Sequence, residues 1–165
     1  MSDRLPIKFV LLAACTAAFI WLTSRGLPEV VASHFEADGH ANGFMSRGAY
    51  VGLMLILDAG LPALLVAITS AALASPTARI NLPNRDYWLA PERRGETVSY
   101  LRSHMVRFAG VLMIFLSFVH WLVVRANQAQ PARLSSSWIN AGLAAFVVFA
   151  LIWTRVLLRR FRKGP

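Results

Sequence analysis

The second apolar run of the chain reads AYVGLMLILDAGLPALLVAITSAALA, residues 49–74. It is long enough to cross a membrane as a helix, which takes roughly 17–25 residues. Three further apolar runs occupy residues 6–23, 106–124 and 138–158. Because backbone groups in lipid must bond internally, these runs predict an all-α fold, an integral membrane bundle of four transmembrane helices.

The overall composition agrees with a membrane protein. Of the 165 residues, 56% are hydrophobic and only 15% are charged, and the mean hydropathy is +0.52. This is more apolar than a soluble domain of the same length needs for one core. Because no repeat, low-complexity tract or domain-sized soluble segment interrupts the pattern, we expect residues 1–165 to form a single polytopic membrane domain.

Basic residues are distributed unequally between the two sides of the predicted bundle. The net charge is +9, but its distribution fits the positive-inside rule better than nucleic-acid binding. The two termini and the 75–105 connection are therefore expected in the cytoplasm, and the loop between the first two runs faces outward. The thirteen residues of the basic side are Arg4, Lys8, Arg79, Arg85, Arg93, Arg94, Arg102, Arg107, Arg155, Arg159, Arg160, Arg162 and Lys163, against Arg25, Arg47, Arg125 and Arg133 opposite.

The 75–105 connection carries its own pattern. Val98, Leu101, Met105 and Phe108 recur at helical spacing, which predicts a cytoplasmic amphipathic helix that lies on the membrane surface and leads into the third span. A segment before it is interpreted as either an interfacial anchor or a docking surface for a cytoplasmic partner. That segment comprises Asn84, Asp86, Tyr87 and Trp88.

Asp58 is the residue within the spans that most needs an explanation. An ionisable group at membrane depth is costly and often marks function. Pro62 follows four residues later and removes a backbone hydrogen bond, so the helix should kink beside the carboxylate. The Asp58 carboxylate and the backbone carbonyl that Pro62 leaves free could together bind a proton, a cation or a polar group of a ligand. The alternative is that Asp58 bonds to a neighbouring helix and only holds the bundle together.

His120 is the candidate partner of Asp58. The third span brings it toward the outer side, about one or two turns shallower than Asp58. We expect a small polar cavity formed by Asp58, His120 and the loop that contains His34, and histidine protonation would make it sensitive to pH. The alternative for His120 is an interfacial position beside Trp121.

The outward loop places four potential ligands at alternate positions, and Gly39 would let the chain turn among them. Two histidines and two carboxylates are possible zinc ligands, with His34 and His40 as the weak metal candidates. The spacing is not a recognised zinc pattern, however, and exposed loops carry such residues for solubility. The four are His34, Glu36, Asp38 and His40.

Several motifs between residues 27 and 74 resemble a bacterial membrane domain of unknown function, number 1648, found at the N-terminal end of SdpI-type toxin-immunity and signalling proteins. In that pattern an asparagine commonly stands at the position of Glu36 and a lysine at that of Arg47, which makes His34 and Gly39 more characteristic than Glu36 and His40. The motifs are Leu27-Pro28, His34-Phe35, Gly39, Gly43, Ser46-Arg47 and Pro62.

The resemblance implies a multi-pass protein of the bacterial inner membrane that protects against a secreted toxin and holds a repressor at the membrane. The implied partners are a secreted peptide or small ligand outside and a cytoplasmic regulator inside. A homo-oligomer is a separate expectation, which rests on the small number of spans for a transporter. SdpI-type proteins carry an additional C-terminal membrane region that this chain is too short to match. The resemblance therefore implies the immunity role of those proteins for this chain only in part.

Three classes of function are therefore compatible with the sequence. The first is a binding, sensing or immunity protein whose outward loop covers a polar site near Asp58, with His34, Glu36, Asp38, His40, Arg47 and His120 as candidate ligand-binding residues. The second is a membrane-embedded enzyme, with or without an assisting metal, that uses His34, Asp58 and His120. The third is a small ion-coupled transporter subunit. No nucleophile–base pair, phosphate loop or redox motif is visible, which favours the first class, and we expect no cofactor.

Overall fold

The structure is a computed structural model that describes residues 7–75 and 80–162. The expectations for Arg4, Arg79 and Lys163 concern residues outside these ranges. Within them, four helices are long and apolar enough to cross a membrane, and the prediction of four transmembrane helices is confirmed. Their bounds are Ile7–Gly26, Arg47–Ala74, Pro91–Asn127 and Ser136–Arg162.

The first helix, α1, covers Ile7–Thr23 and continues as a short 3-10 turn, η1, at Ser24–Gly26. It ends there because Pro28 follows: the residue before a proline is driven out of the helical region. Leu27 accordingly has φ −76° and ψ 148°.

The second spanning helix contains a π-turn. It consists of α2 (Arg47–Leu55), the π-turn η2 (Ile56–Gly60) and α3 (Leu61–Ala74). Ser46 caps its start by accepting from the Ala49 backbone N–H at 3.3 Å. The irregularity expected beside Asp58 is this turn: the Leu61 N–H reaches back to the Ile56 carbonyl. Pro62 follows directly at the start of α3 and has no N–H to donate to a carbonyl of the π-turn.

The outward loop of the sequence prediction is a β-hairpin, an element that the all-α prediction did not include. Strands β1 (Val30–Phe35) and β2 (Ala41–Ser46) pair antiparallel with an irregular register around His34. Gly39 permits the turn because it adopts φ +90°, a conformation that costs a glycine little. The turn is closed by the Glu36 N–H, which donates to the His40 carbonyl at 2.8 Å.

The second half of the chain forms α4 (Arg85–Trp88), α5 (Pro91–Asn127) and α6 (Ser136–Arg162). The expected amphipathic lead-in is helical from Pro91, but it does not turn along a surface before the third span. It is continuous with that span in α5, because no proline follows Pro91 before Asn127. At a rise of about 1.5 Å per residue, α5 is about 55 Å long.

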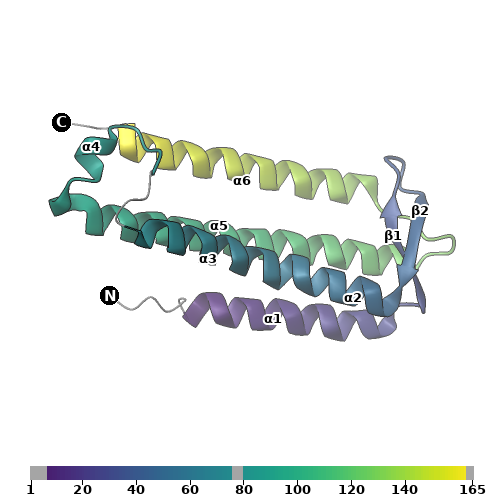
Figure 1. Cartoon of the computed structure of the whole chain (residues 1–165). Coiled ribbons are helices and arrows are strands. Elements are labelled where there is room, and N and C mark those ends of the chain that lie inside the picture. Colours follow the sequence, from purple (N-terminus) through teal and green to yellow (C-terminus); the bar gives the residue numbers. More distant parts are fainter. Residues whose placement is uncertain (1–6, 76–79, 163–165) are drawn as a thin grey trace.

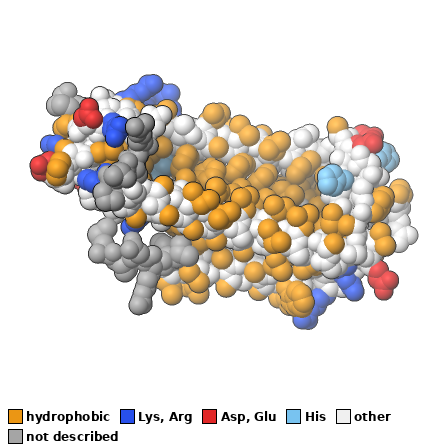
Figure 2. Space-filling view, viewed as in Figure 1, with side chains coloured by type: hydrophobic (Ala, Val, Ile, Leu, Met, Phe, Trp, Pro, Cys, Tyr) orange, Lys and Arg blue, Asp and Glu red, His pale blue; other side chains and the backbone are white. Residues whose placement is uncertain are grey.

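Three of the four spanning helices pack side by side, and α6 lies against α5 at the edge of the bundle (Figure 1). α1 begins and α6 ends at the same end of the bundle as α4, which we call the termini end. The hairpin lies at the other end, the hairpin end (Figure 1). Hydrophobic side chains cover the middle of the face in Figure 2, whereas charged side chains gather at both ends, as expected for helices that cross a bilayer.

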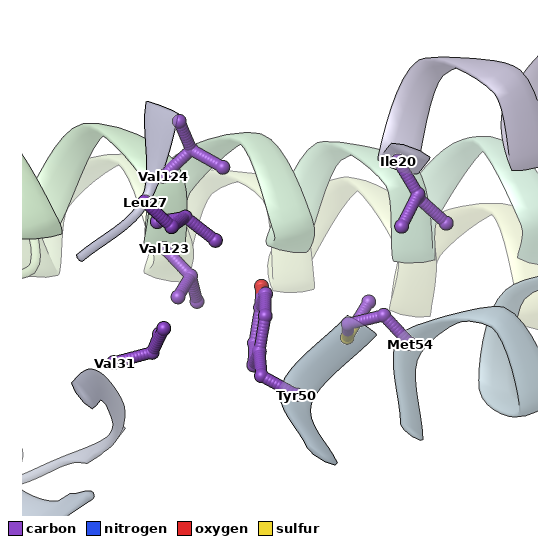
Figure 3. Packing of buried hydrophobic residues seen from close by; sticks show 7 residues of the cluster. All are labelled: Ile20, Leu27, Val31, Tyr50, Met54, Val123 and Val124. Carbon is purple, nitrogen blue, oxygen red and sulfur yellow. The ribbon is translucent and has the colours of Figure 1, made fainter. Parts of the chain in front are cut away.

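Two apolar clusters hold the three central helices together. The cluster near the hairpin end joins α1, α2, α5 and the hairpin, and Figure 3 shows Tyr50 pointing from α2 into it. Its members are Ile20, Leu27, Val31, Tyr50, Met54, Val123 and Val124. The second cluster, nearer the termini end, comprises Phe9, Val66, Ala109 and Met113.

α6 is attached mainly through aromatic rings. The Phe115 ring stacks on Phe146 with centroids 4.6 Å apart, and Trp153 stacks on His104 at 4.3 Å. Of its described side chains only Phe161 is buried. Many of its other apolar side chains, such as Leu143, Leu151 and Ile152, are exposed and would face lipid in a bilayer.

Candidate functional site

His120 lies at the centre of a polar layer between the three packed helices. Its side chain is fully buried, with Thr23 of α1 on one side and Tyr50 of α2 on the other. Nε2 lies 2.8 Å from the Thr23 Oγ1, and Nδ1 lies 2.9 Å from the Tyr50 hydroxyl. The predicted interfacial position beside Trp121 is therefore not where the imidazole lies; both ring nitrogens have protein partners.

The hydrogen-bond network assigns the tautomer of His120. The Thr23 hydroxyl donates to the Phe19 carbonyl at 2.7 Å, so its oxygen accepts from His120 Nε2–H. Nδ1 then accepts from the Tyr50 hydroxyl. A neutral imidazole with its proton on Nε2 satisfies every group in the layer. The layer is thus a closed, preorganised network in an apolar surrounding.

Asp58 forms a second polar layer, about one helical turn farther from the hairpin. The Ser117 hydroxyl on α5 donates to Asp58 Oδ2 at 2.8 Å, and Ser117 precedes His120 by three residues, which is one turn. Thr16 of α1 also lies beside the carboxyl, although its hydroxyl donates to the Ala13 carbonyl at 3.2 Å. The alternative expectation for Asp58 was a hydrogen bond to a neighbouring helix. The Ser117 hydroxyl on α5 supplies that hydrogen bond.

One oxygen of this carboxyl has no partner. Asp58 is fully buried, and within the described part of the chain Oδ1 accepts no hydrogen bond. Buried polar atoms are nearly always paired, and an exception calls for a cause. The carboxyl also sits in the π-turn Ile56–Gly60, a type of irregularity that is frequent at functional sites.

A groove between α1 and α5 reaches the hydroxyls beside this carboxyl. We call it the α1–α5 groove; its volume is about 430 Å³. Thr16 and Ser117 are the hydroxyl residues among those that line it, and both adjoin Asp58. The other lining residues are Cys15, Phe19, Ile114, Phe118 and Trp121. Asp58 does not itself line the groove, but the two hydroxyl residues beside its carboxyl do.

Asn127 fixes the hairpin to the end of α5. Its Oδ1 accepts from the Ala32 N–H at 2.9 Å, and its Nδ2 donates to the Ala32 carbonyl at 2.9 Å and to the Val123 carbonyl at 2.9 Å. One side chain thus completes the backbone bonds of a strand residue that is 1% exposed. Strand β1 is therefore bonded directly to the last residue of α5.

The four candidate ligands of the hairpin do not share one centre with Asp58 and His120. His34 and His40 are exposed, and His34 faces Gly43 across the hairpin. The Asp38 carboxylate lies 3.9 Å from His40 Nε2, and Glu36 accepts from the Asn42 amide at 3.3 Å. The described residues contain no group of three His, Cys, Asp or Glu side chains close enough to hold a metal ion.

Arg47 braces the base of the hairpin. Its Nη1 donates to the Leu27 carbonyl at 3.0 Å, and its backbone N–H donates to the Glu29 carbonyl at 2.8 Å. A guanidinium has five N–H donors, so most of them stay available to other groups on the exposed side of this residue.

The segment singled out in the 75–105 connection binds the end of α6. Asn84 Nδ2 donates to the Phe161 carbonyl at 3.1 Å, and Trp88 Nε1 donates to the same carbonyl at 3.0 Å. Tyr87 lies under the guanidinium of Arg93, 4.1 Å from its ring centroid, and Asp86 is exposed. Asn84 and Trp88 therefore cap a helix whose last carbonyls have no partner within the helix.

Sequence reasoning identified Asp58 and His120 but missed most of their partners. Thr16, Thr23, Tyr50 and Ser117 are ordinary residues within apolar runs, and Asn127 lies just beyond the predicted third run, 106–124. One signal was present: Thr16 and Thr23 stand seven residues apart, which places them on one face of α1.

Comparison with known proteins concerns the first third of the chain. Residues 10–57 match the family model of a domain of unknown function, DUF1648. The resemblance to this domain is confirmed, but the matched stretch includes α1 and ends one residue before Asp58. Thr23, Tyr50 and the hairpin lie within it, whereas Ser117 and His120 lie outside. Neither the curated proteins nor the solved structures contain a match.

Proposed function

We propose that this membrane protein is a sensor of the immunity type, in which the hairpin recognises a secreted peptide and α5 carries the response to the other side. The observation that carries the proposal is the Asn127–Ala32 pair, in which both backbone groups of a buried strand residue are bonded to the last residue of α5. Any displacement of β1 therefore acts on α5 directly.

The distribution of charge supports an outward-facing hairpin. Thirteen of the 17 basic residues belong to the sequence regions assigned to the termini end, and basic residues favour the cytoplasmic side. The termini, α4 and the beginning of α5 are then cytoplasmic, and the hairpin faces the outside of a bacterial inner membrane.

The hairpin has features that suit an extended, basic peptide. Among the residues that the structure describes, β2 pairs with β1 alone, so its other edge can accept a further strand. Phe44 is 61% exposed and Val30 is 63% exposed. Residues 29–46 contain Glu29, Glu36 and Asp38 and no lysine or arginine. An amphiphilic peptide of positive charge would complement these groups.

At the termini end, α5 is bonded to α4 and to the end of α6, the segments that a cytoplasmic regulator would bind. The Thr97 hydroxyl donates to the Trp88 carbonyl at 2.8 Å, and Glu96 accepts from Arg160 at 2.7 Å. A shift of α5 would therefore disturb both α4 and the capped end of α6. Exposed Asp86 and Arg85 offer charged contacts to a partner there.

The test compares three forms of the protein in cells that lack it: wild type, Asn127→Ala and Asn140→Ala. Asn140 is an exposed asparagine on α6 and serves as the matched control. Cells are challenged with a panel of secreted, membrane-active peptides. We expect wild type and Asn140→Ala to protect against at least one peptide, and Asn127→Ala, at equal membrane abundance, to lose that protection. Equal survival with and without wild-type protein across the panel would contradict the proposal.

A second candidate is an ion-coupled transport subunit, favoured by the unpaired Oδ1 of Asp58 beside the α1–α5 groove. The test is proton flux into proteoliposomes under an imposed pH gradient. Flux that is lost in Asp58→Asn and kept in Asp86→Asn, which alters an exposed carboxylate, would support transport. Flat traces for the wild type at several protein densities would exclude it.

A further inference from the structure

A second groove lies at the hairpin end, between η1 and α2, and has no role in the proposed sensing. Its volume is about 560 Å³, within the range of small-molecule sites. We call it the arginine groove after the two basic residues that line it, Arg25 and Arg47. Its remaining lining residues are Trp21, Ser24, Gly48, Val51, Gly52 and Leu55.

The groove has a polar head and an apolar body. Arg25, Arg47 and Ser24 stand where the apolar part of α1 ends, whereas Leu55 lies two turns, about 12 Å, farther along α2. Trp21 is 56% exposed and lies at the boundary, a position that tryptophan favours between lipid tails and headgroups. Basic and polar residues at one end of the groove and apolar residues along the rest of it match a molecule with an anionic head and a hydrocarbon chain.

Ser24 supplies an independent indication of a polar ligand. The residue is 3% exposed, and within the described ranges its hydroxyl oxygen has no hydrogen-bond partner. A buried hydroxyl without a partner costs about 1–3 kcal/mol. Because Ser24 lines the groove beside Arg25 and Arg47, a phosphate oxygen that reached this hydroxyl would satisfy it.

Two glycines create the apolar part of the groove. A Cβ atom added at Gly48 or Gly52 would meet no atom within 4 Å, so the space over this face of α2 is open. Glycines spaced by four residues can also pack two helices together. In a symmetric dimer through this face, however, Arg25 and Arg47 of both copies would meet without acidic lining residues between them. Charge therefore favours a lipid over a second copy.

We propose that the arginine groove binds one anionic phospholipid of the leaflet at the hairpin end. Arg25, Arg47 and Ser24 bind its phosphate group, and one acyl chain lies over Gly48 and Gly52 toward Leu55. A guanidinium suits phosphate because it presents paired N–H donors.

The experiment is lipid binding to purified, delipidated protein in detergent, followed by native mass spectrometry. Phosphatidylglycerol is compared with phosphatidylcholine of the same chains and with soluble glycerol phosphate. The variants are Gly52→Leu, which fills the groove, and Arg25→Gln, which removes a charge. Their matched controls are Gly95→Leu, also built into open space, and Arg125→Gln, an arginine at the same end that does not line the groove.

We expect wild type and both controls to bind phosphatidylglycerol at least tenfold more tightly than phosphatidylcholine, and both groove variants to lose that preference. Unchanged phosphatidylglycerol binding by Gly52→Leu would overturn the proposal. So would a dimer that Gly52→Leu dissociates, since a second copy would then occupy the groove. Glycerol phosphate binding as tight as that of the lipid would also overturn it, because the groove would then recognise a headgroup alone.

Discussion

The Tyr50 hydroxyl lies 2.9 Å from Nδ1 of His120, and the two rings stack with their centroids 5.7 Å apart. This contact joins α2 to α5 at the level where the hairpin enters the core. Because Nε2 is bonded to Thr23 of α1, the imidazole connects all three central helices.

Replacing Tyr50 by phenylalanine should destabilise the bundle. The ring stays, but Nδ1 of His120 loses its donor in an apolar surrounding, which costs about 1–3 kcal/mol. The free energy of unfolding in mixed micelles, measured by titration with SDS, checks this. Tyr100→Phe is the control, since Tyr100 contacts His104 and Arg160 through its ring. An equal loss in both variants would mean that the hydroxyl bond contributes nothing specific.

The turn of the hairpin should not tolerate a side chain at Gly39. Alanine there would hold φ near +90° and bring its Cβ against the Leu134 carbonyl oxygen. We expect a cost on the order of 1–3 kcal/mol, confined to the hairpin and to its contact with the 128–135 connection. Hydrogen exchange of residues 30–46 should accelerate in Gly39→Ala and stay unchanged in Gly26→Ala, where the added Cβ meets no atom within 4 Å. Identical exchange in both variants would argue against the strained turn.

The approach of α6 to α5 should depend on Gly142. A Cβ atom there would collide with the Phe118 ring, and overpacking of this kind typically costs about 1–3 kcal/mol. Gly142→Leu is therefore expected to separate the two helices and to speed tryptic cleavage at Arg133, in the connection between them. Gly95→Leu, at an open position of α5, is the control. Cleavage of Gly142→Leu at the rate of the control would show that Phe118 moves aside without cost.

Trp88→Phe should loosen the end of α6 while leaving its membrane part intact. The variant removes the N–H that donates to the Phe161 carbonyl at 3.0 Å, and a single neutral hydrogen bond contributes about 0.5–1.5 kcal/mol. Hydrogen exchange should rise in residues 155–162 and stay constant in 138–150. Trp138→Phe, on an indole that is 60% exposed, should change neither segment. Increased exchange along the whole of α6 would instead indicate that Trp88 holds the helix in place.

The sequence was sufficient for the helices and insufficient for their contacts. Each span could be read from an unbroken apolar run, because lipid imposes the helix whatever the neighbours are. The partners of His120 could not be read this way. A run that is apolar on all sides does not reveal which face meets another helix, so Ser117 carried no distinguishing signal. For Thr23 the one signal was its seven-residue spacing from Thr16.

The hairpin was missed for a related reason. Its strands show the alternation of ligand-type residues that suggested a metal loop, but their pairing depends on Gly39 and on Asn127, which is distant in the sequence. The predicted approach of His34 to Asp58 treated this segment as a loop that covers the carboxylate. A paired strand places His34 opposite Gly43 instead, and Asn127 fixes that strand on the end of α5.

The peripheral position of α6 has an evolutionary consequence. Because only Phe161 is buried among its described side chains, substitutions between leucine, isoleucine, valine and phenylalanine along its outer face leave every other helix unaffected. On the three central helices the residues of the polar layers cannot be exchanged in this way, since His120 bonds to Thr23 and Tyr50 across helices. The outer face of α6 can therefore change its apolar side chains toward the lipid without disturbing a polar layer.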